Sequence, residues 1–151
     1  MLSAAIYRNS LWFALFISLV LTGNAQAKPE HGKKFKDWMV VCEKLPASQK
    51  EVCNIFQNVT NDKDKVVMQV AVGYPPGSEE PQALVTLPLG VLLQPGIEFK
   101  AGNAEASRFP FSVCVKNGCV AIVKLNAETV KGMKTGNKGS VKFAAAQKKI
   151  I

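Results

Sequence analysis

The sequence contains a single histidine, His31, among its 151 residues. Serine and cysteine hydrolases need a well-placed imidazole base, and His31 falls in a polar stretch that we expect to be flexible. The sequence also lacks the C-x-x-C motif of redox enzymes, the paired cysteine knuckles of zinc sites and a glycine-rich phosphate loop. We therefore predict no catalytic residues, no metal ligands and no cofactor, and we interpret the protein as a non-enzyme.

Long apolar runs are also scarce, and the only notable one spans residues 11–21 (LWFALFISLVL). Arg8 precedes this run, and Ala25, Gln26 and Ala27 follow it as an A-x-A site. These are the three parts of a secretory signal, so we predict a signal peptide at residues 1–27 with cleavage between Ala27 and Lys28. The alternative is an uncleaved anchor, but a spanning helix needs about 20 apolar residues.

Removing residues 1–27 leaves a chain long enough for one domain. No later apolar segment approaches spanning length, so we expect no transmembrane segment after cleavage. Residues 28–36 are polar and contain proline and glycine, which favours a flexible leader. We assign residues 37–151 to one folded domain.

Acidic residues are few in the last third of the chain. Eight lysines and one acid, Glu128, lie between Lys116 and the end, and the whole chain has a formal charge of +8. The lysines are either ordinary solvated side chains that discourage edge-to-edge aggregation or a basic surface for an anionic envelope component or an acidic protein. An exported chain without a recognition motif is not expected to bind nucleic acid.

The cysteines number four, and all of them lie after the predicted cleavage point: Cys42, Cys53, Cys114 and Cys119. An even number in a short exported domain indicates two disulfides. We favour the local pairs Cys42–Cys53 and Cys114–Cys119, because each pair flanks a turn-rich segment.

The second pair presents a geometric problem. Asn117 and Gly118 form a strong two-residue hairpin signal, and a turn centred on them would place Lys116 opposite Cys119 and would favour crossed pairing. A Cys114–Cys119 bridge instead requires, in our interpretation, a four-residue loop over residues 115–118, with Gly118 at positive φ.

Short segments of alternating apolar residues, separated by turn residues, follow one another along the domain. Expected strands are residues 37–43, 51–59, 65–73, 83–87, 91–93, 97–100, 109–115, 119–125 and 140–146. The one expected helix covers residues 126–134, with Asn126 as its N-cap and Gly132 and Gly136 limiting it. Many short strands with few helices predict an all-β, antiparallel sandwich or barrel.

Several motifs occur in an order that resembles a known family. They are Trp38 with Cys42, then Cys53, then residues 87–91 (LPLGV), then residues 111–119 (FSVCVKNGC). The chain is similar over about residues 35–143 to the invasion-associated locus B family of exported bacterial proteins. The resemblance implies an immunoglobulin-like β-sandwich, a periplasmic or cell-envelope location and, in pathogenic members, a link to host-cell invasion and virulence. It implies no reaction and no functional residues. We expect a protein of the periplasm or cell envelope, or a secreted one.

Loops and the lysine-rich third are the candidate partner surface, because loops on a rigid scaffold commonly carry binding. We select Tyr74, Glu79, Glu80, Arg108, Lys131, Lys134 and Lys138. The leading hypothesis is a non-enzymatic envelope protein that binds an unknown protein or an anionic envelope component. The alternatives are a structural or stress-resilience envelope protein without a specific ligand, and an unrecognised enzyme with a concave polar pocket.

Overall fold

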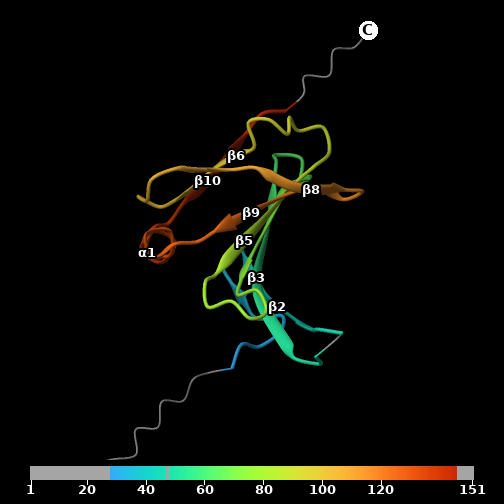
Figure 1. Ribbon diagram of the computed structural model, residues 1–151, viewed down its shortest axis with the longest axis vertical. Coiled ribbons are helices and arrows are strands. Elements are labelled where there is room, and N and C mark those ends of the chain that lie inside the picture. The colour runs from blue at the N-terminus through green and yellow to red at the C-terminus, as the bar shows by residue number, and fades with distance from the viewer. Residues whose placement is uncertain (1–27, 47, 146–151) are drawn as a thin grey trace, which may run out of the picture.

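The computed structural model describes residues 28–46 and 48–145. The predicted signal peptide and its cleavage point at Ala27 lie outside the described residues. The elements in chain order, drawn in Figure 1, are β1 (Lys34–Phe35), β2 (Trp38–Lys44), β3 (Glu51–Thr60), β4 (Val66–Gly73), β5 (Gln82–Leu87), β6 (Ile97–Ala101), β7 (Ser107–Phe109), β8 (Phe111–Val115), β9 (Gly118–Lys124), α1 (Ala127–Thr135) and β10 (Gly139–Phe143). Within these ranges no helix has the length and apolarity needed to cross a lipid bilayer.

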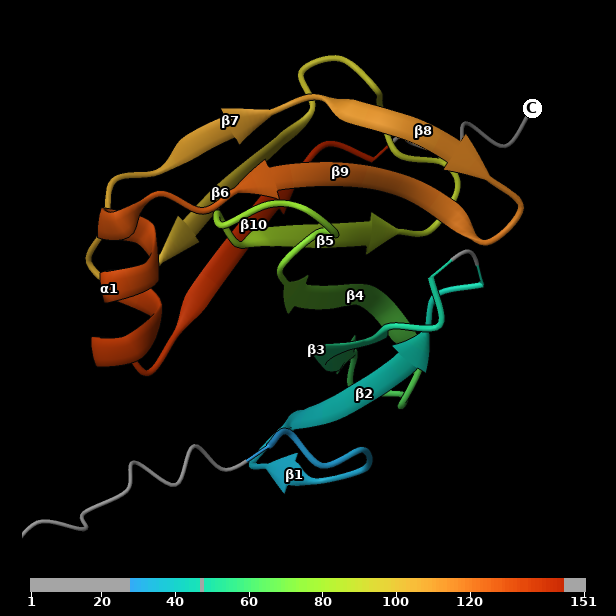
Figure 2. The ribbon, with the colours of Figure 1, turned by 60° about the horizontal axis from the view of Figure 1, so that its bottom comes forward.

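The strands form two antiparallel sheets, which confirms the predicted all-β class. The large sheet has seven strands in the order β1-β2-β3-β4-β5-β9-β8, and the small sheet has three in the order β10-β6-β7. The first five strands are neighbours in chain order, so this part of the large sheet is a simple meander. Figure 2 shows the small sheet and α1 beside the β5 and β9 part of the large sheet, with β1 and β2 at the far end.

The core lies between the small sheet and the part of the large sheet that it covers. Alternate residues of β5, β6 and β9 are buried, as the period-2 pattern requires. The buried cluster comprises Val70, Ala83, Val85, Leu87, Ala121, Val123 and Leu125 from the large sheet and its C-terminal continuation, and Ile97, Phe99 and Ala101 from the small sheet. Trp38 is half-buried against this cluster and belongs to the core, as do Val130 and Met133 of α1.

Pro110 divides what we expected to be one strand over residues 109–115. Proline has no backbone N–H to donate to a ladder, and regular pairing stops at this residue. Phe109 on the preceding strand, β7, pairs with Ile97 of the small sheet, whereas Phe111 on the following strand, β8, pairs with Ala121 of the large sheet. The chain therefore changes sheets at Pro110.

The end of the fold near β10 also differs from expectation. Residues 91–93 form no strand, and Val91 makes only an isolated bridge to Ala145. The reason is the run of turn residues around this segment, with Gly90 and Gly96 both at positive φ. The last strand, β10, ends at Phe143, and residue 146 of the expected strand lies outside the described residues.

Part of the expected flexible leader has regular structure. Strand β1 pairs with β2, the Gly32 N–H donates to the Val40 carbonyl at 2.8 Å, and the Cys42 N–H donates to Nδ1 of His31 at 3.0 Å. The free edge of β2 offers backbone donors and acceptors that need partners, and the leader supplies them. His31 therefore has a structural role at this edge.

Both disulfides join directly opposed residues on neighbouring strands. Cys42 bonds to Cys53 across β2 and β3, and Cys114 bonds to Cys119 across β8 and β9, as the local pairing predicted. The prediction that the second pair needs a four-residue loop is wrong, but Gly118 has the predicted positive φ, at 141°. Val115 pairs with Gly118, so the turn holds only residues 116–117 and lies one position earlier than the Asn117-Gly118 signal indicated.

Helix α1 begins at its predicted cap and packs tightly on β6. The Asn126 side chain accepts a hydrogen bond from the Thr129 N–H at 2.8 Å, which satisfies a helix-end donor. Gly132 does not end the helix, contrary to expectation, and is buried inside it. A Cβ at Gly132 would clash with the carbonyl oxygen of Ala101, so glycine is required by the close approach of α1 to β6.

We expect the C42A/C53A double variant to lose about 2–3 kcal/mol in free energy of unfolding, because the bridge restricts the unfolded chain. Urea denaturation of the oxidised protein measures this loss. Under full reduction the difference should disappear, since wild type and variant then both lack their bridges. Equal stability of the two oxidised proteins would show that the Cys42–Cys53 bond does not stabilise the fold.

Replacing Gly132 with alanine should destabilise the fold by about 1–3 kcal/mol, since the new methyl group must displace α1 from β6. Helix propensity acts in the opposite direction, because alanine is favoured over glycine by about 1 kcal/mol. Thermal unfolding measures the net sign. The matched control is Lys131→Ala on the exposed side of the same helix, and a stabilised G132A protein would rule out the close contact.

Candidate functional site

The outward face of the small sheet carries a row of charged side chains. The antiparallel register places Lys142 of β10 opposite Glu98 of β6, and Glu98 opposite Arg108 of β7. Their neighbours along the strands, including Ile97 and Phe99, belong to the core. Side chains at alternate positions face opposite sides of a sheet, so these three charged groups share the solvent side.

Glu98 is the only acid in this row and interacts with both cations. Lys142 Nζ donates a hydrogen bond to Glu98 Oε1 at 2.8 Å, and Arg108 Nε lies 3.9 Å from Glu98 Oε2. The hydrogen bond from Lys142, followed by the charge of that lysine, lowers the pKa of Glu98. One ionised carboxylate between two cations leaves the row with a net positive charge.

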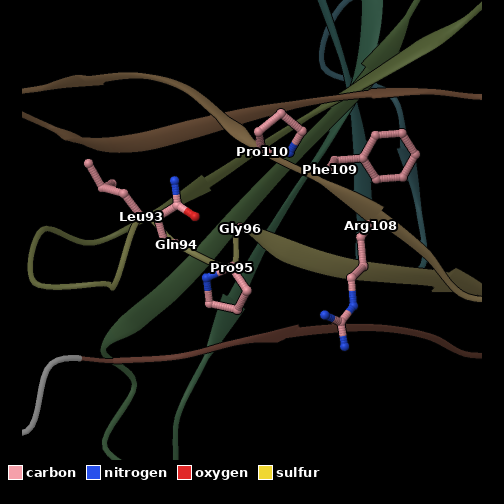
Figure 3. Close-up of a pocket in the computed structure, with 7 residues that line it drawn as sticks. All are labelled: Leu93, Gln94, Pro95, Gly96, Arg108, Phe109 and Pro110. Atoms are coloured by element: carbon pink, nitrogen blue, oxygen red, sulfur yellow. The ribbon is translucent and has the colours of Figure 1, made fainter.

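Two adjoining shallow depressions lie beside the row. One of about 220 Å³ is lined by Leu93, Gln94, Pro95, Gly96, Arg108, Phe109 and Pro110. The other, of about 240 Å³, is lined by Pro95, Gly96, Ile97, Glu98, Arg108, Lys142, Phe143 and Ala144. In Figure 3 Arg108 extends to the side opposite Phe109, and Pro95 lies between Leu93 and Arg108. The surface is thus apolar with basic side chains at its margin.

The loop between β5 and β6, residues 88–96, exposes leucines next to these two depressions. We call it the leucine loop. Leu89, Leu92 and Leu93 are 60%, 45% and 55% exposed. The Leu92 N–H donates to the Ala144 carbonyl at 2.8 Å, so the loop runs beside the end of β10, where Phe143 is also exposed.

Four of the sequence-predicted surface residues fall on one structural unit. Arg108 lies on β7, Lys131 and Lys134 lie on α1, and Lys138 precedes β10, where its carbonyl accepts a hydrogen bond from the Gly102 N–H. Together with Lys100 of β6 and Lys142 of β10 they form what we call the basic band: Lys100, Arg108, Lys131, Lys134, Lys138 and Lys142, all exposed. These elements and the segments that connect β6 to β7 and α1 to β10 contain three acids, Glu98, Glu105 and Glu128.

The other predicted surface residues do not join this unit. Tyr74, Glu79 and Glu80 are exposed on the loop between β4 and β5, and none of them lines either depression. The Glu80 N–H donates to the Ser78 hydroxyl at 3.1 Å, which is a local turn contact. The end of this loop approaches the start of α1, because the Leu125 N–H donates to the Pro81 carbonyl at 3.1 Å. These acids therefore lie outside the four elements of the basic band, on a loop that ends beside one of them.

Sequence reasoning missed Glu98, Lys142 and the leucine loop. The Glu98–Lys142 contact joins residues 44 positions apart, and no local pattern reveals such a pair. The leucines were visible in the sequence, but we assigned residues 91–93 to a strand and did not select these leucines as surface residues. The turn residues Gly90, Pro95 and Gly96 were the signal that could have corrected this assignment.

The outer face of the large sheet presents a second apolar surface. Met39, Phe56, Ala71, Leu84 and Ile122 lie opposite one another in a row across five strands. The next row contains Asn58, Gln69 and Thr86, with the Gln69 amide donating to the Asn58 side chain at 3.0 Å. The Thr86 row continues into Val120, and on the other side of Ile122 the neighbouring row contains Gln82 and Lys124. This face therefore has mostly neutral neighbours and one cation.

The described residues hold no cluster of three or more histidine, cysteine or acidic side chains that could bind a metal ion. The pKa of Glu51 is lowered by its hydrogen bond from Lys28, as that of Glu98 is by Lys142. Carboxyls with a lowered pKa stay ionised at neutral pH, whereas a general acid needs a raised pKa. These two groups act as ion-pair partners.

We expect Lys142→Met to raise the pKa of Glu98 relative to the wild type, because the largest cause of its lowering is removed. NMR titration of the side-chain carboxyl carbon measures this shift. Lys124→Met on β9 is the control and should leave Glu98 unchanged. A pKa of Glu98 that is the same in K142M and wild type would contradict the ion pair.

The sign of the linked stability change follows from the lowered pKa. The folded protein holds the Glu98 proton less tightly than the unfolded chain, so the pair stabilises the fold at neutral pH. The contribution is small, because Lys142 is exposed to water. That contribution is lost as the pH falls below the ordinary value of 4.5 and through the lower folded value.

Comparison with known proteins places this fold in a family. The family model described as Invasion associated locus B (IalB) protein matches residues 38–151. The crystal structure of invasion associated protein B from Bartonella henselae is similar, with a TM-score of 0.67, 18% sequence identity and coverage of 76% of each chain. At that identity the likeness concerns the fold, and a search of curated proteins finds no match. The chain belongs to the invasion associated locus B family.

Proposed function

We propose that this protein is an exported, non-enzymatic binding module of the bacterial cell envelope that contacts a negatively charged partner through the basic band. The observation that carries the proposal is the band itself. It gathers six exposed cations from four elements and a connecting segment, and a single carboxylate, Glu98, faces two of them. A concentrated positive surface attracts anionic partners and accelerates their association.

Export, to the periplasm, the cell envelope or the cell exterior, is supported by two independent features. The N-terminal 27 residues have the composition of a signal peptide. Both pairs of cysteines are oxidised, and the described residues contain no free cysteine. Disulfides persist in oxidising compartments, so the bonding pattern agrees with a periplasmic location.

A contribution to host-cell invasion is part of the proposal and rests on the family to which the chain belongs. A binding role suits the geometry better than catalysis. The two depressions beside the ion row are shallow and largely apolar in lining. Enclosure of the reacting groups away from water, which strengthens catalytic electrostatics, is not a property of such open surfaces.

The charge-reversal variant K131E/K134E/K138E tests the proposal. We expect it to sediment with isolated bacterial envelopes at least about tenfold less than the wild type, because three attractive charges become repulsive. The matched control is K50E/K63E/K65E, which reverses three exposed lysines in the β2–β3 and β3–β4 turns. Equal sedimentation of the wild type and K131E/K134E/K138E would remove the α1 part of the basic band from the model of binding.

A further inference from the structure

The leucine loop exposes more apolar surface than its position in the fold requires. Leu89, Leu92 and Leu93 each leave about half or more of their side chain in contact with water. Leu89 and Leu92 line neither of the two depressions. Grouped exposed apolar side chains mark interaction sites on soluble proteins.

The loop is held in this conformation by contacts at both ends. Val91 bridges Ala145, the Leu92 N–H donates to Ala144, and the Gly96 N–H donates to the Leu93 carbonyl at 3.0 Å. Gly96 has a φ of 78°, and a Cβ there would clash with the carbonyl oxygen of Phe109. The leucines are therefore presented by a fixed turn and need no rearrangement to become exposed.

Cations border these leucines on the side of the small sheet. Leu93 and Arg108 line the same depression, and Arg108 lines the second depression together with Lys142 and Phe143. Figure 3 shows Leu93 and Arg108 on opposite sides of Pro95. The surface thus continues from the apolar loop into the Arg108 and Lys142 end of the basic band.

Apolar side chains on a protruding turn with adjoining cations match the chemistry of one class of surface. A lipid bilayer with anionic headgroups accepts leucine side chains at the headgroup–acyl boundary and attracts lysine and arginine at its surface. The outer face of the large sheet has a single cation beside its apolar row, because Lys124 follows Ile122 on the same side of β9. The leucine loop adjoins two, Arg108 and Lys142.

We propose that the leucine loop, with Arg108 and Lys142, is a docking site for the surface of an anionic phospholipid bilayer. Leu89, Leu92 and Leu93 enter the interface, and the two cations contact the headgroup phosphates. The proposal rests on the proposed function and specifies its partner. In the proposed orientation, the leucine loop and the C-terminal end of β10 face the membrane.

The test uses the exported protein purified from the periplasm and sedimented with vesicles. We expect binding to vesicles of phosphatidylcholine with about 30% phosphatidylglycerol and little binding to pure phosphatidylcholine. The L92S/L93S variant should bind the anionic vesicles at least about tenfold more weakly. The matched control V113S/V115S changes two valines on β8 that are similarly exposed, at 52% and 49%, and should bind like the wild type.

A spectroscopic measurement tests insertion without relying on loss of binding. In a Leu93→Trp variant the added indole should shift its emission to shorter wavelength with anionic vesicles, whereas wild-type emission, from Trp38, should stay unchanged. Unshifted emission, or equal binding by L92S/L93S and wild type, would overturn leucine insertion.

The outcomes separate this inference from the proposed function. If the wild type binds envelopes through the basic band but ignores anionic vesicles, the lipid site is wrong and the envelope function stands. If protease treatment of the envelopes abolishes that binding, the partner is an acidic protein. If the wild type binds neither envelopes nor vesicles, both proposals fail.

Discussion

The pairing of β5 with β9 is the interaction on which the rest of the structure depends. It runs over six residue pairs from Gln82 and Lys124 to Leu87 and Cys119, and the inward-facing residues of both strands are almost fully buried. Gly118 begins β9 where a side chain would clash with the carbonyl oxygen of Leu87. The β5–β9 pair joins the N-terminal meander to the C-terminal third. The small sheet and α1 pack against its inward face.

The candidate site is built from the chain that leaves β5 and returns to β9. Residues 88–117 make the leucine loop, β6, β7 and β8 before the chain rejoins the large sheet. Pro110 interrupts the pairing on this path, so Arg108 faces outward on one sheet while Cys114 is bonded on the other. Strand β10 then returns to β6 and completes the ion row with Lys142. The site therefore combines residues that the sequence keeps far apart.

The two apolar surfaces of the molecule differ in their borders, and this difference supports a specific role for one of them. The row across the outer face of the large sheet is flanked mainly by amide and hydroxyl groups and by one cation, Lys124, whereas the leucine loop adjoins two cations. Exposed ion pairs contribute little to stability, so the ion row of Glu98 is not needed to hold the sheet together. Its net positive charge agrees with the anionic partner that we propose.

The sequence by itself determined the local features of this protein, because alternation, capping and turn chemistry act between near neighbours. It predicted most of the strands, the Asn126 cap, both cysteine pairs and the family. Tertiary structure decided what depends on distant contacts: the ordering of the leader by the edge of β2, the burial of Gly132 against β6, the turn at residues 116–117 set by the opposed cysteines, and the meeting of Glu98 with Lys142. The sequence contains the leucines of the leucine loop in plain form, but only the tertiary structure showed that they lie outside the core.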